Sequence, residues 1–115
     1  MAVLQELRLD RPRRCLELVY DDGSRFTLDA EYLRVESPSA EVQGHAPEEH
    51  RTIGGCRNVA ITGVEPVGNY GVTLIFDDGH DTGVYTWAYL HQLGREHDTR
   101  WPAYLAALEA EGLTR

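Results

Sequence analysis

Two stretches of the chain alternate apolar and polar residues and then end in the same acidic turn. Residues 16–23 (LELVYDDG) and residues 72–79 (VTLIFDDG) place an apolar side chain at every second position and close on Asp-Asp-Gly. An alternation of period two is typical of a half-buried β-strand, and Asp-Gly pairs favour tight turns between strands. The two stretches therefore predict β-hairpins over residues 15–28 and residues 70–85.

The chain also continues alike after each hairpin. Tyr32-Leu33 follows the first, and Tyr89-Leu90 follows the second after one residue of slack. Two interpretations stay open at this point. Any pair of hairpins with acidic turns would look alike, or the chain contains a pseudo-repeated unit whose two hairpins pack into one antiparallel sheet.

Two more strands are predicted beside these hairpins. Residues 3–9 alternate as a first strand, and residues 59–67 carry a strand signal that ends at a Gly68-Asn69 turn. Residues 36–57 are polar, have neither helical nor strand periodicity, and predict a long loop. A chain of 115 residues is the length of one domain, so residues 1–115 are assigned to a single domain.

Two helices are predicted at the C-terminal end. Thr86 is a suitable N-cap for the first helix, and Gly94 suits its end. Thr99 caps the second helix, with Pro102 in the first turn, where a missing N–H costs little. The predicted fold class is α+β, with antiparallel hairpins forming a sheet and two C-terminal helices packed on it. Apolar residues at helical spacing support both helices: Trp87, Leu90 and Leu93, then Trp101, Tyr104, Leu105 and Leu108.

The charge balance excludes several classes of partner. The chain has 11 basic and 19 acidic residues, a formal net charge of -8. Proteins that bind nucleic acid or anionic membranes need an excess of Lys and Arg, so neither partner is expected. The N-terminal residues have no apolar core of a signal peptide, and no stretch is long enough to span a membrane. With two cysteines and no Cys-x-x-Cys pair, the chain is expected to be cytoplasmic, with reduced thiols.

His80 is the first candidate for chemistry, because it follows the second Asp-Asp-Gly turn. An imidazole there can bind a metal, titrate near neutral pH, or simply form hydrogen bonds that hold the turn. His45, His50 and Cys56 lie in the polar loop and would offer further ligands for zinc or iron. Their spacing is not that of a compact zinc site, and solvated loop residues are the alternative. Cys56 also has Arg57 beside it, which favours a thiolate, but no base is in sight.

The motifs of common enzymes are missing from the sequence. It contains no phosphate-binding loop, no Gly-x-Gly-x-x-Gly and no Gly-x-Ser-x-Gly elbow. The paired carboxylates are adjacent residues in turns, unlike the separated pair of a glycosidase. The sequence therefore predicts no catalytic residues.

Residues 78–90 (DGHDTGVYTWAYL) and residues 32–42 (YLRVESPSAEV) resemble the DUF971 family of small bacterial proteins, and the likeness extends over nearly the whole chain. The same family is similar to the N-terminal domain of γ-butyrobetaine and trimethyllysine hydroxylases. In those hydroxylases the resemblance implies a zinc-binding module with three cysteines and one histidine. The histidine corresponds to His80, whereas the cysteine positions fall on Ser37, Ser39 and Val42. The downstream domain that carries the hydroxylases' iron and 2-oxoglutarate chemistry is absent from this sequence.

Three functions follow as hypotheses. The first is a non-catalytic accessory module that binds a protein, linked by the resemblance to iron–sulfur or 2-oxoglutarate oxygenase systems, with Tyr70, Tyr85 and Trp87 as contact residues. The second is a zinc- or iron-binding domain that uses His80 with the loop ligands. The third is a small enzyme with an unfamiliar site. A free strand edge would also allow a homodimer.

Overall fold

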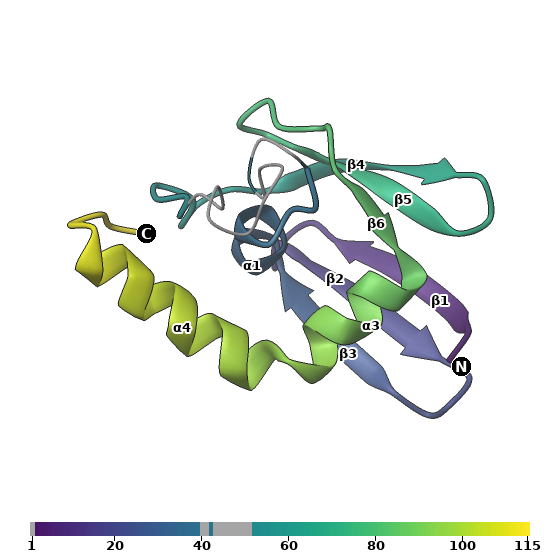
Figure 1. Cartoon of the computed structure of the whole chain (residues 1–115). Coiled ribbons are helices and arrows are strands. Elements are labelled where there is room, and N and C mark those ends of the chain that lie inside the picture. The colour runs from purple at the N-terminus through teal and green to yellow at the C-terminus, as the bar shows by residue number, and fades with distance from the viewer. Residues whose placement is uncertain (1, 40–41, 43–51) are drawn as a thin grey trace.

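The computed structural model describes residues 2–39, residue 42 and residues 52–115. Strands and helices follow the order β–β–β–α twice, and one more helix ends the chain (Figure 1). The bounds are β1 Leu4–Asp10, β2 Cys15–Tyr20, β3 Arg25–Asp29, α1 Ala30–Val35, β4 Ile61–Val67, β5 Gly71–Phe76, β6 Val84–Thr86, α3 Trp87–Arg95 and α4 His97–Ala110.

Within the described residues, the strands form two three-stranded antiparallel sheets, in the orders β1-β2-β3 and β4-β5-β6. The α+β class with antiparallel hairpins and C-terminal helices is therefore confirmed, but the hairpins divide between two sheets instead of sharing one. The physical reason is that each central strand, β2 or β5, is already paired on both sides by strands of its own half. Neither sheet then needs a strand from the other.

The two halves of the chain are geometric repeats of each other. In each turn the glycine takes a left-handed conformation, with φ of 87° at Gly23 and 91° at Gly79. The second aspartate accepts the backbone N–H two residues later, at 2.8 Å from Ser24 to Asp22 and 3.1 Å from His80 to Asp78. The central strands share one burial pattern. These matches support the pseudo-repeat over a chance likeness of two hairpins.

The sequence patterns did not predict α1, which directly follows β3. It has only six residues, too few for helical periodicity to show, and no side chain caps its N-terminus. The sequence repeat did indicate a helix here, because Tyr32 in α1 corresponds to Tyr89 in α3. The Tyr32 hydroxyl donates to the carbonyl of Leu93 at 2.6 Å, and the Tyr89 hydroxyl donates to the carbonyl of Glu36 at 2.5 Å. Each half thus closes on the helix of the other.

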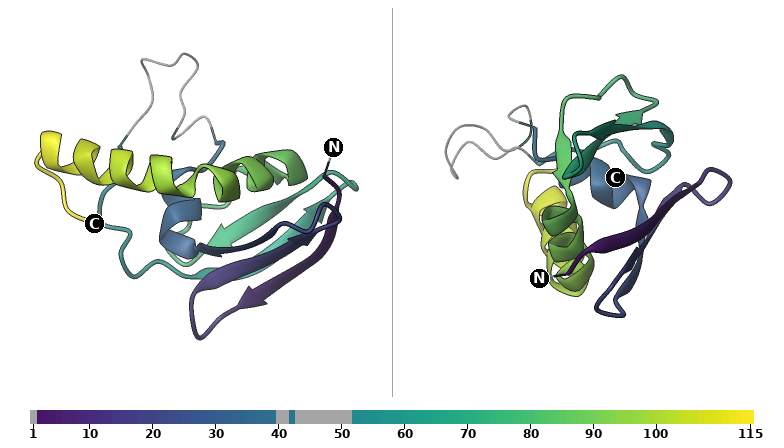
Figure 2. Two further views of the ribbon diagram at one scale, coloured as in Figure 1. Left: turned by 90° about the horizontal axis from the view of Figure 1, so that it is seen from below. Right: turned by 90° about the vertical axis from the view of Figure 1, so that its right-hand side faces the viewer.

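The C-terminal helices α3 and α4 follow one another nearly in line along one side of the sheets (Figures 1 and 2). Thr86 caps α3 as predicted, because its hydroxyl accepts the N–H of Tyr89 at 3.1 Å. Gly94 lies inside α3 and does not end it; a Cβ there would lie 2.4 Å from the ring of Phe26. The helix α4 begins at His97, two residues before the predicted cap at Thr99.

The core lies between the two sheets and the helices, and most of the predicted apolar residues belong to it. Leu90 and Leu93 of α3 are fully buried, and Tyr104 and Leu108 of α4 are also buried. Leu105 departs from the predicted apolar face of α4, because 38% of it is exposed. None of the helices formed by the described residues combines the length and the apolar character that crossing a membrane requires.

Candidate functional site

His80 lies at the end of the β5–β6 turn and is 7% exposed. The turn fixes its backbone, since its N–H donates to Asp78 Oδ1 at 3.1 Å and its carbonyl accepts the N–H of Phe76 at 3.0 Å. Its ring lies 6.1 Å from the ring of Phe76, centroid to centroid. The imidazole is therefore held inside the fold and does not project from a hairpin tip.

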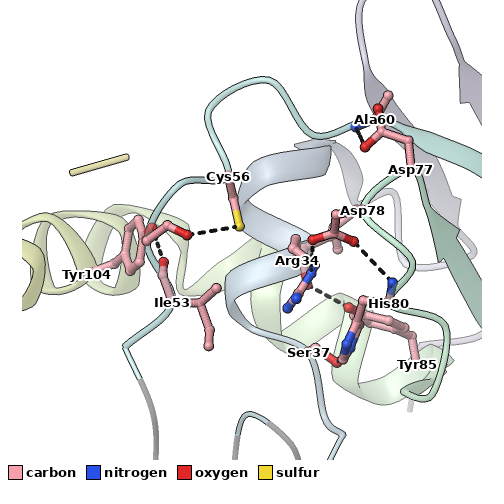
Figure 3. Close-up of polar contacts among 12 residues, drawn as sticks. Arg34, Ser37, Ile53, Cys56, Ala60, Asp77, Asp78, His80, Tyr85 and Tyr104 are labelled. Atoms are coloured by element: carbon pink, nitrogen blue, oxygen red, sulfur yellow. Dashed lines mark hydrogen bonds and ion pairs between the residues drawn. The ribbon is translucent and has the colours of Figure 1, made fainter. Parts of the chain in front are cut away.

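Ser37, which follows α1, meets His80 across the site. Its side-chain oxygen lies 2.8 Å from Nε2 of His80, and Figure 3 shows the two side chains lying together. The same oxygen accepts the backbone N–H of Ser39 at 3.2 Å, and the Ser39 hydroxyl lies 2.8 Å from that of Thr82. A Cβ on Gly83 would lie 2.6 Å from the Ser37 oxygen, so only glycine permits this close approach. Ser37, Ser39, His80 and Thr82 thus form one polar cluster, buried except at Thr82 and called the Ser–His cluster below.

An ion pair supports the Ser–His cluster from the side of α1. Arg34 Nε donates to Asp78 Oδ2 at 2.8 Å, and the Arg34 side chain is only 13% exposed (Figure 3). Among the described residues, Nη1 of Arg34 is buried without a hydrogen-bond partner. Tyr85 closes the cluster from β6, donating its hydroxyl to the carbonyl of Leu33 at 2.6 Å, and burial raises the pKa of its phenol. Apart from the acidic turn itself, no pattern in the sequence indicated the Arg34–Asp78 pair.

The residues at this site do not fit the zinc ion that the family resemblance implies. Zinc is bound by thiolates, imidazoles and carboxylates, whereas Ser37 and Ser39 offer neutral hydroxyls and Val42 offers no donor atom. Two donors on one tetrahedral zinc lie about 3.3 Å apart. The Ser37 oxygen and His80 Nε2 are closer, at 2.8 Å, which is a hydrogen-bond distance. Among the described residues, the donors at this site form a hydrogen-bonded cluster and lack the chemistry of a zinc site.

Of the other predicted ligands, Cys56 lies in the part of the chain that the structure describes. Cys56 is buried, its thiol donates to the carbonyl of Gly54 at 3.7 Å, and burial raises its pKa above that of an ordinary thiol. A raised pKa disfavours the thiolate that a reactive cysteine or a metal ligand needs. His45 and His50 lie outside the described residues. Within the part of the chain that the structure describes, no three His, Cys, Asp or Glu side chains are grouped so that they could hold a metal ion.

The three predicted contact aromatics differ in exposure. Tyr70, at the β4–β5 turn, is 53% exposed. Trp87 is half-buried, and its indole N–H donates to the carbonyl of Asn69 at 2.8 Å. Tyr85 is 1% exposed, so the structure places it in the core and corrects its assignment as a contact residue. Its position on β6 faces inward because period two along the strand puts Val84 and Thr86 on the other face.

Three solved structures resemble the chain over most of its length. Two are NMR solution structures with 44% and 45% sequence identity; both cover 100% of this chain, 90% and 86% of their own, and superpose with a TM-score of 0.85. The third is a crystal structure of a DUF971-family protein of unknown function from Acidithiobacillus ferrooxidans. It is 37% identical, covers 79% of this chain and 91% of its own, and has a TM-score of 0.67. No curated protein matches the chain.

The family comparison covers the two repeated halves and the connection between them. Residues 7–91 match the family described as Gamma-butyrobetaine hydroxylase-like, N-terminal; the start of β1, the end of α3 and the whole of α4 lie outside the match. The Ser–His cluster and its supporting ion pair lie inside the matched residues. The chain therefore belongs to the gamma-butyrobetaine hydroxylase-like N-terminal domain family.

Proposed function

We propose that this protein is a non-catalytic accessory module that acts by binding a protein partner. The observation that carries the proposal is the state of the side chains in the Ser–His cluster. His80 and Ser37 are 7% and 0% exposed, and they are hydrogen-bonded to each other. A buried and internally bonded imidazole is poorly placed to exchange protons with a substrate. The arrangement favours a structural role for the Ser–His cluster, which leaves the surface to perform the function.

The β4–β5 turn is the surface that best suits a protein partner. Tyr70 is exposed there, and Trp87 at the start of α3 holds its backbone in place: the Tyr70 carbonyl accepts the N–H of Trp87 at 3.0 Å, and the Trp87 indole donates to the carbonyl of Asn69. A fixed, exposed tyrosine is typical of the residues that contribute most to binding energy at protein interfaces. Because the chain has a net charge of -8, the complementary partner is a protein with a basic face around an apolar pocket.

The family gives a class of partner to examine first. Its description names the N-terminal part of a gamma-butyrobetaine hydroxylase-like protein. We therefore propose oxygenases of the same cell as the first candidates, and iron–sulfur proteins, to which the sequence resemblance also links the domain, as the second.

Site-specific photo-crosslinking tests the proposal. A photoreactive phenylalanine analogue replaces Tyr70 in one variant and Leu105 in a second, since Leu105 is also exposed but lies on α4. The expected result is one protein crosslinked from position 70 and absent from position 105. The purified partner should then bind the wild-type chain, and Tyr70→Ala should weaken binding at least about tenfold, the effect of a strong interface residue. Equal crosslinking from both positions, or unchanged affinity in Tyr70→Ala, would overturn the proposal.

A further inference from the structure

A cavity of about 180 Å³ opens where four distant segments of the chain meet. They are the β1–β2 turn, the start of α1, the segment before β4 and the C-terminal residues. Four arginines line this cavity, here called the arginine cavity: Arg13, Arg14, Arg57 and Arg115.

The charge in the arginine cavity is opposite to that of the whole chain. The lining itself carries four guanidinium groups and two carboxylates, Asp29 and Glu31. The net charge of the chain is -8, and no lysine occurs anywhere in the sequence. A local group of positive charges in an acidic domain attracts anions, which the rest of the surface repels.

The four arginines differ in how many hydrogen bonds and ion pairs their guanidinium groups already form. Arg13 is paired with Asp10 and Glu17, and Arg115 binds both carboxylate oxygens of Glu31. The guanidinium of Arg14 donates a single hydrogen bond to the described residues, from Nη1 to the carbonyl of Asn58 at 3.3 Å. Arg57 is exposed and makes no hydrogen bond or ion pair with any described residue. Since a guanidinium carries five N–H donors, Arg14 and Arg57 keep most of theirs available at the cavity.

The backbone of Arg14 gives a second reason to regard the arginine cavity as a binding site. Among the described non-glycine residues, Arg14 alone has a positive φ, of 53°. Its carbonyl accepts the N–H of Ala30 at 2.8 Å, which accounts for the backbone position. Glycine or asparagine would adopt that conformation at lower cost, so the packing does not account for an arginine. An unfavourable conformation kept at a cavity points to a role for the side chain.

We propose that the arginine cavity binds a phosphate group. The cavity is smaller than the roughly 300–1,000 Å³ of pockets that enclose whole small molecules, so it accommodates one charged group. A phosphate monoester carries about two negative charges at neutral pH. That is one for each of Arg14 and Arg57, whereas Arg13 and Arg115 are already paired with carboxylates of the described residues. The planar donors of Arg14 and Arg57 suit the oxygens of a phosphate, which guanidinium groups bind in pairs. This site is separate from the Tyr70 surface, and neither proposal depends on the other.

An NMR titration of the full chain tests the phosphate site. Arginine Nε–H resonances are followed while sodium phosphate is added at constant ionic strength, with sodium chloride and sodium acetate as parallel titrations. Saturable shifts are expected for Arg14 and Arg57 with phosphate and not with the other two salts. Arg57→Ala should weaken phosphate binding by about tenfold, as expected for one charge-assisted hydrogen-bonding group. The phosphate affinity of Arg57→Lys should lie between those of the wild type and Arg57→Ala, because lysine keeps the charge and loses the paired donors.

Arg25→Ala is the matched control, since Arg25 is an exposed arginine on β3 outside the cavity. It should bind phosphate as the wild type does. A phosphoserine peptide that binds more tightly than inorganic phosphate would assign the group to a phosphorylated protein, and the reverse order would assign it to a free phosphate compound. Shifts that do not saturate, acetate that binds as tightly as phosphate, or Arg25→Ala weakening binding as much as Arg57→Ala would overturn the proposal.

Discussion

Replacing Asp78 with alanine is expected to destabilise the protein strongly, because it leaves Arg34 charged and unpaired. Asp78 accepts hydrogen bonds from Arg34 Nε at 2.8 Å and from the backbone N–H of His80 at 3.1 Å. Arg34 is 13% exposed, and its Nη1 is already without a partner among the described residues. Removing the carboxylate would therefore leave the Arg34 guanidinium with almost no hydrogen bonds to replace those it made to water in the unfolded chain.

The expected loss follows from the degree of burial. Breaking a fully buried ion pair costs about 3–5 kcal/mol in free energy of unfolding. Asp78 is 35% exposed, so water can replace part of what its carboxylate provides, and we expect about 2–3 kcal/mol for Asp78→Ala. The equivalent change, Asp22→Ala, should cost clearly less. Its partner in the other half is His91, whose Nε2 lies 3.0 Å away and whose Nδ1 already accepts a hydrogen bond from Arg95.

Urea denaturation monitored by circular dichroism measures these differences. The double variant Asp78→Ala/Arg34→Met is the decisive comparison, since methionine fills much of the same space without a buried charge. It should be more stable than Asp78→Ala alone, because the uncompensated guanidinium is gone. The reasoning is refuted if the double variant is less stable than Asp78→Ala, or if Asp22→Ala costs as much as Asp78→Ala.

Three further predictions concern packing, pH and metal. Gly94→Ala should lower the free energy of unfolding by about 2 kcal/mol, because the new Cβ would lie 2.4 Å from Phe26 and the ring must move; thermal unfolding measures the loss, which Phe26→Leu should partly restore. The pKa of Asp22 is lowered to about 2 by hydrogen bonds from the Ser24 side chain and backbone and from His91. Since this is below the unfolded value of about 3.9, Asp22 stabilises the fold above about pH 4 and loses that effect as the pH falls through about 2. A pH series of urea denaturation should show a shallower acid loss in Asp22→Asn, and an unchanged slope would contradict the assignment. Finally, neither zinc nor a chelator should shift the unfolding temperature of the wild-type chain, whereas Ser37→Cys/Ser39→Cys/Val42→Cys should gain stability with zinc. A wild-type chain that zinc stabilises, and His80→Ala that it does not, would instead favour the metal-binding function.

The sequence predicted the parts of this fold that short-range patterns describe. Alternation and the Asp-Asp-Gly turns located both hairpins, and the Thr86 cap located α3, because these signals lie within a few residues of each other. It did not predict α1, because six residues are too few for a helical period, nor the role of Gly94, because Phe26 is remote in the chain. Long-range contacts of this kind leave no local pattern.

The candidate site shows the same limit. His80 was singled out by its place after a turn, and the family resemblance singled out Ser37 and Ser39. The hydrogen bond between Ser37 and His80 joins residues that are 43 positions apart in the sequence, and Arg34 and Asp78 are 44 positions apart. Tyr85 was predicted to be a surface contact residue. The prediction was wrong because an aromatic residue in a strand can lie on either face. Only the packing of β6 against the core decides which face it occupies.

The hydrogen bonds exchanged between the two halves have a consequence for how the protein unfolds. Asp22 of the first half binds His91 in the helix of the second, and Asp78 of the second binds Arg34 in the helix of the first. The two halves thus make the same contact in both directions, as the two subunits of a symmetric dimer do. Neither half retains its full set of partners when the other opens, so partial unfolding gains little entropy for the contacts it loses. The protein should therefore unfold in a single cooperative transition, and a ligand held by either half would protect both.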